Sequence, residues 1–329
     1  MMRVLFVTNR YPSAETPGDS PCIQQQEIAL QRLGHDVNVL YIPKGAPKLK
    51  YARAMWQVFW SVQVLKRFDL IHAHYGYCGV VAKMQWRSPV VVTFRGSDVY
   101  SRSGPKRLLG RLVAKSADAV IVMNDDMQHQ LACPGSHIIP YGIDTDLVKP
   151  EPQDRARRAL GLPLQAPLVL FPYDPARQVK RFDLAQQAVD LLKRELPDVQ
   201  MLVVYDRPYR DAIRYMNACD ALLLTSDSEG APGAVREALA CNLPIVSVDV
   251  GDVAQVIGDT DGCYIVARDP EDIAQKLARV LRARQRTNGR HAAQELSIAH
   301  SAANVAALYA RLSRDGNTRV DPRVSANPH

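Results

Sequence analysis

The feature that most constrains this chain is an alternation of short β-branched runs with longer helical patterns. In the first half, runs such as RVLFVT, LIHAH and AVIVM are separated by segments whose apolar residues are spaced as on one face of a helix. Strands joined in this way predict a parallel, doubly wound sheet. The predicted strands of this half are residues 3–8, 37–42, 70–74, 89–93, 119–123 and 137–140.

The same alternation restarts after a linker-like stretch that follows Pro150. Because 329 residues exceed the usual size of one domain, two α/β lobes are predicted, at residues 1–150 and 165–290. The polar segment 315–329 is expected to be a disordered tail. The predicted strands of the second lobe are residues 168–173, 201–205, 221–226, 244–250 and 264–266.

The composition is that of a globular protein, with 47% apolar and 23% charged residues. Apolar runs stay well short of the roughly 18 residues needed to cross a bilayer, and the segment MMRVLFVTNRYP resembles a first strand more than a signal peptide. The six cysteines are scattered, without a CxxC pattern or zinc-type spacing. These observations predict a cytoplasmic protein that is soluble or peripheral on a membrane, without a bound metal or cofactor.

The net charge of +7 lies entirely in the first half of the chain. Residues 1–150 hold 18 Lys and Arg against 11 Asp and Glu, whereas residues 151–329 hold 23 of each kind. An anionic partner is therefore expected for the first lobe, and nucleic acid, a membrane surface and a phosphorylated substrate all remain possible.

The most specific segment follows the predicted strand 221–226 and reads SDSEGAPGAVREALACNLPIVSVDVG. It places Glu229 and Glu237 eight residues apart. On a single helix their carboxylates would lie roughly 12 Å apart, which is too far for a glycosidase acid/base pair but suits two hydroxyl clusters of one extended ligand. Open α/β sheets bind ligands at the carboxyl ends of their strands, and amides beside glycine at a helix start favour a diphosphate.

This segment resembles the E-x7-E motif of the family 4 retaining glycosyltransferases, which have the two-lobed GT-B fold. The similarity extends to about residue 312 and includes YMNACDALLLTSDSEG and IIPYGIDTDLVKP. It implies that Glu229 contacts the transferred sugar and that Glu237 contacts the ribose of a nucleotide-diphosphate-sugar, UDP- or GDP-linked. The remaining residues of this motif that would bind the donor are Gly230, Ala231 and Gly233.

The resemblance also implies cations that neutralise the departing diphosphate. In FPYDPARQVKRFDLAQQAVDLL, Lys180 matches the family's lysine, and Arg177 takes the place of an arginine that usually lies two residues earlier. The alternative is that Lys180 is an ordinary basic residue in the first turn of a helix. The predicted catalytic residues are therefore Glu229, Lys180 and Arg177, in a mechanism that needs no metal ion.

In the first lobe, VVVTFRGSDV resembles the family's T-x-H-G-x-D loop, with Arg95 where histidine is commoner. Arg95 is expected to contact the donor phosphate or the acceptor. Asp98, His72 and His74 are candidates for the acceptor side of the cleft, although a buried, hydrogen-bonded histidine is the alternative for each of the two histidines.

Two further expectations concern the architecture. Only RPYRDAIR lies between MLVVYD and YMNACD, where relatives of this kind carry another strand and helix, so the donor lobe is predicted to lack one βα unit. The resemblance further implies that a helix near residues 296–313 packs back on the first lobe.

The segment KGAPKLKYARAMWQVFWSVQVLKRFD combines cations with aromatic residues. It could lie on an anionic membrane and present a lipid-linked acceptor to the cleft, or its aromatic residues could pack against the lobe's own sheet. The sequence leaves both arrangements open.

The leading hypothesis is thus a retaining hexosyltransferase that acts on a saccharide or lipid-linked acceptor in cell-envelope or exopolysaccharide assembly. A nucleotide-sugar epimerase of similar fold is an alternative, and it would need the histidines or Asp98 as acid/base groups. A basic nucleic-acid-binding protein is a third, although no nucleic-acid-binding motif is found and nucleic acid is not expected as a partner.

Overall fold

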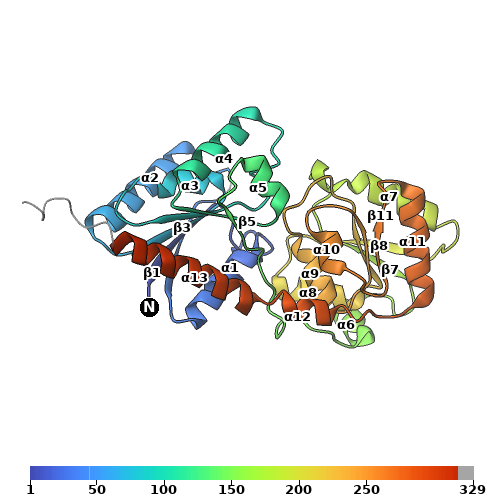
Figure 1. Ribbon diagram of the computed structural model, residues 1–329. Helices are drawn as coiled ribbons and strands as arrows, with labels where there is room; N and C mark the ends of the chain where they lie inside the picture. Colours follow the sequence, from blue (N-terminus) through green and yellow to red (C-terminus); the bar gives the residue numbers. More distant parts are fainter. Residues whose placement is uncertain (44, 318–329) are drawn as a thin grey trace, which may run out of the picture.

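A computed structural model describes residues 1–43 and 45–317 and shows two lobes, each built on a parallel sheet (Figure 1). The strand order of the first sheet is β2-β1-β3-β4-β5-β6, and every neighbouring pair is parallel. The predicted doubly wound fold is therefore confirmed for this lobe. Its strands are β1 (Arg3–Thr8), β2 (Asp36–Tyr41), β3 (Leu70–His74), β4 (Val90–Thr93), β5 (Ala119–Val122) and β6 (His137–Ile138).

Helices cover both faces of the first sheet, which explains why β3 and β4 are buried along their whole length. Helices α2, α3 and α4 lie together on one face, and α1 lies on the other beside the last helix of the chain (Figure 1). The helices between the strands are α1 (Pro21–Arg32), α2 (Lys48–Val58) with its π-helical continuation Phe59–Val64, α3 (Gly76–Ala82), α4 (Gly104–Ser116) and α5 (Asp125–Leu131).

The second sheet has five parallel strands in the order β11-β10-β9-β7-β8. Within the described chain, α8 is the one helix between β8 and β9, which agrees with the predicted shortening of this lobe. The strands are β7 (Leu168–Phe171), β8 (Gln200–Val203), β9 (Ala221–Leu224), β10 (Ile245–Val248) and β11 (Cys263–Val266). Its helical segments are α6 (Gln153–Leu160), a 3₁₀ turn (Gln178–Lys180), α7 (Phe182–Leu192), α8 (Tyr209–Ala218), α9 (Gly233–Ala240), α10 (Val253–Ile257), α11 (Pro270–Ala283) and α12 (Arg290–Glu295).

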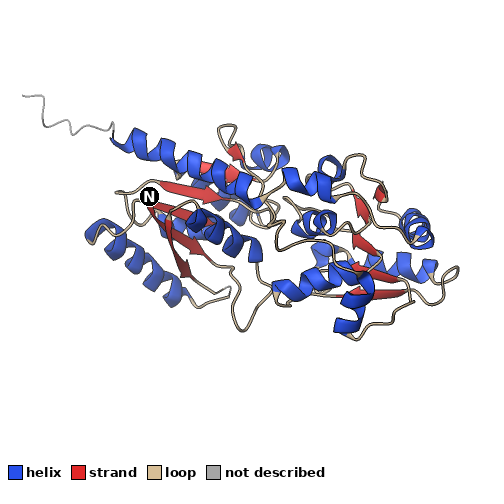
Figure 2. Ribbon diagram, turned by 90° about the horizontal axis from the view of Figure 1, so that it is seen from below, coloured by secondary structure: helices blue, strands red, loops and turns tan. Residues whose placement is uncertain are grey.

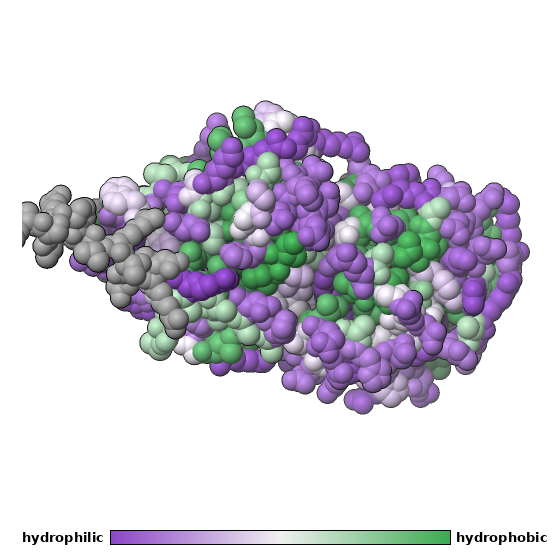
Figure 3. Space-filling view, viewed as in Figure 1, coloured by the Kyte–Doolittle hydropathy of each residue, from purple (hydrophilic) through white to green (hydrophobic). Residues whose placement is uncertain are grey.

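The chain then returns to the first lobe as α13 (Ile298–Asn317), which packs beside α1 (Figures 1 and 2). Residues 315–317 belong to this helix, so the predicted tail begins too early, and residues 318–329 lie outside the described part of the chain. Figure 3 shows hydrophilic residues along the outer rim of the second lobe, with hydrophobic patches nearer the middle of the molecule.

The two segments that connect the lobes are hydrogen-bonded to each other. The N–H of Ile143 donates to the carbonyl of Leu296 at 2.8 Å, and the N–H of Ile298 donates to the carbonyl of Ile143 at 2.8 Å. A Cβ on Gly142 would lie 2.2 Å from the carbonyl oxygen of Ser297, so only glycine permits this approach. The connecting segments therefore form one two-stranded joint.

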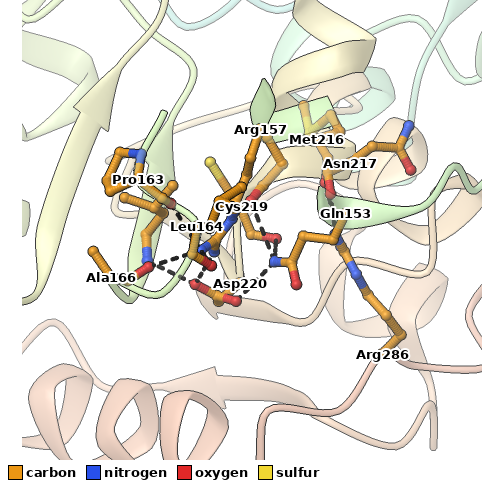
Figure 4. A network of polar contacts seen from close by, with 12 residues as sticks. Gln153, Arg157, Pro163, Leu164, Ala166, Met216, Asn217, Cys219, Asp220 and Arg286 are labelled. Carbon is orange, nitrogen blue, oxygen red and sulfur yellow. Dashed lines mark hydrogen bonds and ion pairs between the residues drawn. The ribbon is translucent and has the colours of Figure 1, made fainter. Parts of the chain in front are cut away.

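A buried guanidinium braces the amino-terminal end of the second sheet (Figure 4). Arg157 is 3% exposed and donates to Asp220 at 2.8 Å and to the carbonyl of Ala218 at 2.8 Å. It also donates to three carbonyls of the chain that leads into β7, and Asp220 accepts the N–H of Leu168 at 2.7 Å. This network joins the starts of β7 and β9 at the edge of the sheet opposite the strands' carboxyl ends.

Candidate functional site

A cleft of about 450 Å³ lies between the lobes, where the carboxyl ends of both sheets face each other. Strand order reverses between β1 and β3 in one sheet and between β7 and β9 in the other. Loops that follow these strands line the cleft, which is the place where doubly wound sheets bind ligands.

The centre of the cleft contains an ion pair between Lys180 and Glu229. Lys180 comes from the 3₁₀ turn before α7, and Glu229 comes from the loop after β9. Oε1 of Glu229 accepts from Nζ of Lys180 and, at 2.7 Å, from the hydroxyl of Ser226. The structure thus brings together two residues that the sequence assigned to sugar and diphosphate, although they lie 49 residues apart.

Tyr173 lies beside this ion pair and was not found by the sequence reasoning. Nζ of Lys180 is 3.8 Å from the centroid of the Tyr173 ring. The phenol hydroxyl is buried and has no hydrogen-bond partner within the described residues. Burial lowers the pKa of Lys180, an effect that Glu229 opposes, and it raises the pKa of Tyr173 well above its ordinary value. The phenol therefore keeps its proton and can donate a hydrogen bond beside the cleft, which Tyr173 lines.

Two arginines flank Lys180 and have different surroundings. Arg177 lines the cleft and is exposed. Arg181 instead pairs with Asp183 at 2.9 Å and with Asp227 at 3.3 Å. Arg177 is therefore the better placed of the two to receive an anionic ligand.

Glu237 also lines the cleft, but its relation to Glu229 differs from the expected one. Helix α9 begins at Gly233, so Glu229 lies in the preceding loop and the spacing calculated for a shared helix does not apply. Burial raises the pKa of Glu237 to about 7, although a hydrogen bond with Tyr209 works against this shift. The carboxyl group is therefore poised between its neutral and charged forms near neutral pH.

Three glycines allow backbones from both lobes to meet at the cleft. A Cβ on Gly96 would lie 3.0 Å from the nitrogen of Gly230, and a Cβ on Gly251 would lie 2.9 Å from the oxygen of Gly230. Gly96 and Gly251 also have positive φ angles of 109° and 63°. The carbonyl of Gly230 accepts from Nδ2 of Asn124 at 2.6 Å, which ties the loop after β5 to the loop after β9.

Tyr141 provides a second contact between the lobes at the same place. Its hydroxyl donates to the carbonyl of Ala231, next to Gly230. The guanidinium carbons of Arg95 and Arg236 lie 5.8 and 5.6 Å from the centre of its ring. Tyr141 thus provides a hydrogen bond between the lobes at the floor of the cleft.

Arg95 lines the cleft and is held by neutral acceptors. It donates to Sγ of Cys22 at 3.3 Å and to Oε1 of Gln26 at 3.1 Å, and it contacts Nδ1 of His74 at 3.2 Å. Burial lowers the pKa of His74, so this imidazole is neutral and can accept through Nδ1. These contacts orient the guanidinium without compensating its charge, which suits an anionic ligand.

His72 and His74 do not line the cleft, which corrects the expectation for them. His72 is fully buried, with Nδ1 2.5 Å from the hydroxyl of Tyr309 on α13 and Nε2 2.6 Å from Oγ1 of Thr93. Burial lowers its pKa to about 3. His72 is thus a core residue, and His74 is a buried residue that contacts Arg95.

Asp98 has a structural role in the same loop. Its two carboxylate oxygens accept the N–H groups of Arg95, Gly96 and Gly76, each at 3.1 Å. Asp98 lines a second cavity in the first lobe instead of the cleft. Of the acid/base candidates for an epimerase, His72 and Asp98 therefore make structural contacts, and His74 is buried outside the lining of the cleft.

Comparison with known proteins agrees with this geometry. Residues 2–142 match the family described as glycosyl transferase 4-like domain, and residues 186–295 match the family described as glycosyl transferases group 1. A Bacillus subtilis protein named for teichuronic acid biosynthesis, the glycosyltransferase TuaC, is 27% identical over 84% of this chain and 89% of its own length. The D-inositol 3-phosphate glycosyltransferase of Mycolicibacterium smegmatis is 27% identical, over 79% of this chain and 70% of its own.

Solved structures share the fold. Sucrose-phosphate synthase from Thermosynechococcus elongatus has a TM-score of 0.76 at 18% identity, covering 96% of this chain and all of that one. HepE from Anabaena, solved with UDP, has a TM-score of 0.69 at 18% identity, covering 94% of this chain and all of that one. With both lobes matched and the cleft between them, the chain belongs to the group 1, family 4-like glycosyltransferases of the GT-B fold.

Proposed function

We propose that this glycosyltransferase takes a hexose from a nucleotide-diphosphate-sugar and transfers it with retention of anomeric configuration, without a metal ion. The observation that carries the proposal is the Lys180–Glu229 ion pair in the cleft, beside the buried hydroxyl of Tyr173. A cation held against a low-polarity ring is well suited to a departing diphosphate, whose charge grows as the glycosidic bond breaks.

The donor occupies the cleft with its parts distributed over the second lobe. Glu229 holds the sugar hydroxyls, and Glu237 holds the ribose. Lys180, Arg177 and the amides near Gly230 hold the diphosphate. HepE, which shares the fold, was solved with UDP and with UDP-glucose, and UDP-sugars are therefore the first donors to test, followed by GDP-sugars.

The ion pair also suggests how binding and chemistry are linked. When the diphosphate arrives, Lys180 exchanges Glu229 for phosphate oxygens, which leaves the carboxylate available to the sugar hydroxyls. Attack by the acceptor on the face from which the diphosphate departs would then retain the configuration.

The acceptor is a saccharide or lipid-linked molecule in cell-envelope or exopolysaccharide assembly, at the cytoplasmic face of a membrane. The name of TuaC supports an envelope role. No helix in residues 1–43 or 45–317 is long and apolar enough to cross a bilayer. We assign contact with that membrane to a surface of the first lobe.

A tryptophan patch, formed by Trp56, Trp60 and Trp86, is the surface that we assign to this contact. Their exposed fractions are 63%, 41% and 77%. The ring centroids of Trp56 and Trp60 are 5.8 Å apart, and Phe59 lies between Trp60 and Trp86, at 6.4 and 6.1 Å from their rings. Ala54 and Val58 pack inward, so the helix turns its aliphatic side to the core and its indoles to solvent. Exposed indoles among lysines and arginines fit the headgroup region of an anionic bilayer.

Release of nucleotide from a panel of UDP- and GDP-sugars tests the proposed reaction, with the anomeric configuration of the product read by NMR. We expect one donor to be cleaved with retention, and we expect Glu229→Ala to lose activity while nucleotide binding persists. Inversion, or full activity in the variant, would contradict the assignment.

Co-sedimentation with anionic vesicles tests the membrane contact separately. Binding is expected to fall as salt rises from 0.1 to 0.5 M, because the Debye length falls from about 10 Å to roughly 4 Å. Trp56→Ala combined with Trp60→Ala is expected to weaken it. Leu164→Ala, at a 45% exposed leucine of the second lobe, serves as the matched control. Equal binding to neutral vesicles would refute the electrostatic part.

A further inference from the structure

The first lobe contains a second cavity, of about 720 Å³, which the donor does not need. It lies between α2 and the loop before it, helix α3, the loops after β1, β3 and β4, and the first half of α4. Arg10, Tyr75 and Ser97 line both this cavity and the cleft. A ligand bound here can therefore extend one end to the place where the sugar is transferred.

The walls of this cavity combine apolar surface with positive charge. Tyr51 and Met55 of α2 and Leu109 of α4 provide apolar surface, and Lys48 and Lys106 are cations of its lining. Asp98 is its acidic lining residue in the described chain, and its oxygens already accept three backbone N–H groups. The cavity thus offers an apolar interior and unbalanced positive charge.

The cavity also borders the tryptophan patch. Lys48, Ala52 and Met55 line it from one side of α2, and at about 100° per residue Trp56 lies roughly 40° around the helix axis from Ala52. An apolar chain that leaves the cavity along α2 would therefore meet the exposed indoles.

We propose that this cavity binds the acceptor through an apolar chain and an adjoining phosphate, with Lys48 and Lys106 contacting the phosphate. The inference rests on the proposed function, since it names the chemical class of that acceptor. An acceptor sugar attached beyond the phosphate would pass Arg10 and Tyr75 into the cleft. The apolar lining favours the apolar chain of the acceptor, and the two lysines favour its phosphate.

Decyl phosphate, kept below its micelle-forming concentration, is a suitable probe for calorimetry. We expect saturable binding, with decanol and inorganic phosphate each binding at least tenfold more weakly. Lys48→Glu combined with Lys106→Glu is expected to remove the preference for decyl phosphate over decanol.

A filled cavity gives the second arm of the test. Ala52 is an exposed helix residue, so Ala52→Trp can fill the mouth of the cavity without disturbing the core. It is expected to weaken decyl phosphate binding at least tenfold, whereas Gln57→Trp, at an exposed position of α2 outside the cavity lining, is expected to leave it unchanged.

The affinity for UDP, measured on the same samples, verifies folding and separates the two proposals. Failure of decyl phosphate to bind a protein that binds UDP overturns the acceptor site alone. Absence of UDP binding, with decyl phosphate binding retained, overturns the donor assignment instead. Equal affinity for inorganic phosphate and decyl phosphate would show that the cavity binds anions without any contribution from the apolar chain, and it would refute the proposal.

Discussion

Nucleotide binding is expected to weaken as the pH falls below 7, because Glu237 must be ionised to accept the ribose hydroxyls well. Burial raises its pKa from 4.5 to about 7, which corresponds to about 3 kcal/mol at roughly 1.4 kcal/mol per unit. Hydroxyl donors in the complex favour the charged form and lower this pKa again. The Kd is therefore expected to rise by up to about tenfold between pH 8 and pH 6, which is the limit for the loss of one proton from a group whose pKa is about 7.

Calorimetry with UDP or GDP at pH 6, 7 and 8, in buffers of different ionisation enthalpy, measures both the Kd and the protons released. Near pH 7 we expect about half a proton to leave Glu237 for each nucleotide bound. Glu237→Gln has nearly the same shape and does not titrate, so it reports the contribution of the phosphate itself.

The same shift affects stability, with a sign that can be checked. The pKa is higher in the folded state, so between about pH 4.5 and 7 the folded chain keeps a proton that the unfolded chain has lost. The wild type therefore loses stability as the pH rises through this window. Glu237→Gln should gain up to about 3 kcal/mol relative to the wild type between pH 4.5 and pH 8, measured by urea unfolding. Parallel pH profiles for the two proteins, in Kd and in stability, would refute the reasoning.

Three further substitutions address other parts of the molecule. Lys180→Ala is expected to lower kcat by about 100-fold or more and to change donor affinity less, while a chelator leaves the wild-type rate unchanged; an absolute need for Mg²⁺ or Mn²⁺ in steady-state assays would contradict this. Tyr173→Phe keeps the ring under Lys180 but loses the buried hydroxyl, so calorimetry should show nucleotide affinity reduced by about 1 kcal/mol; an unchanged Kd would mean that the hydroxyl does not meet the ligand. Arg157→Ala leaves Asp220 and several carbonyls without their hydrogen-bond donor and is expected to lower the free energy of unfolding, measured with urea, by about 3–5 kcal/mol. A decrease of less than about 1 kcal/mol would contradict this prediction.

The sequence predicted the sheets because the period of its apolar residues is a local property. The meeting of Lys180 and Glu229 followed from a rule about where strands end, since β7 and β9 are neighbours in the sheet. Pro232, directly before the first residue of α9, carried the signal that Glu229 lies outside that helix, because proline favours helix starts.

Other features depend on contacts that no local pattern records. His72 is buried because α13, from the far end of the chain, covers its strand and supplies Tyr309 as a partner. Tyr173 matches no motif, and its position under Lys180 arises only from the turn that follows β7. The second cavity requires α2 and α4 to lie on either side of it, an arrangement that the sequence leaves open.

The two hydrogen-bonded crossings between the lobes also limit how the cleft can open. Two independent connecting segments would allow the lobes to twist, slide and rotate relative to each other. The backbone hydrogen bonds of Ile143 with Leu296 and Ile298 join the two segments, so that they act together as one hinge. Rotation of the lobes about this hinge keeps both hydrogen bonds, whereas twisting one lobe against the other would break them. Helix α13 begins at this hinge and packs into the core of the first lobe. Cutting the chain between α12 and α13 should therefore allow the cleft to open in many directions instead of one. The two lobes would then lose their alignment before either lobe unfolds.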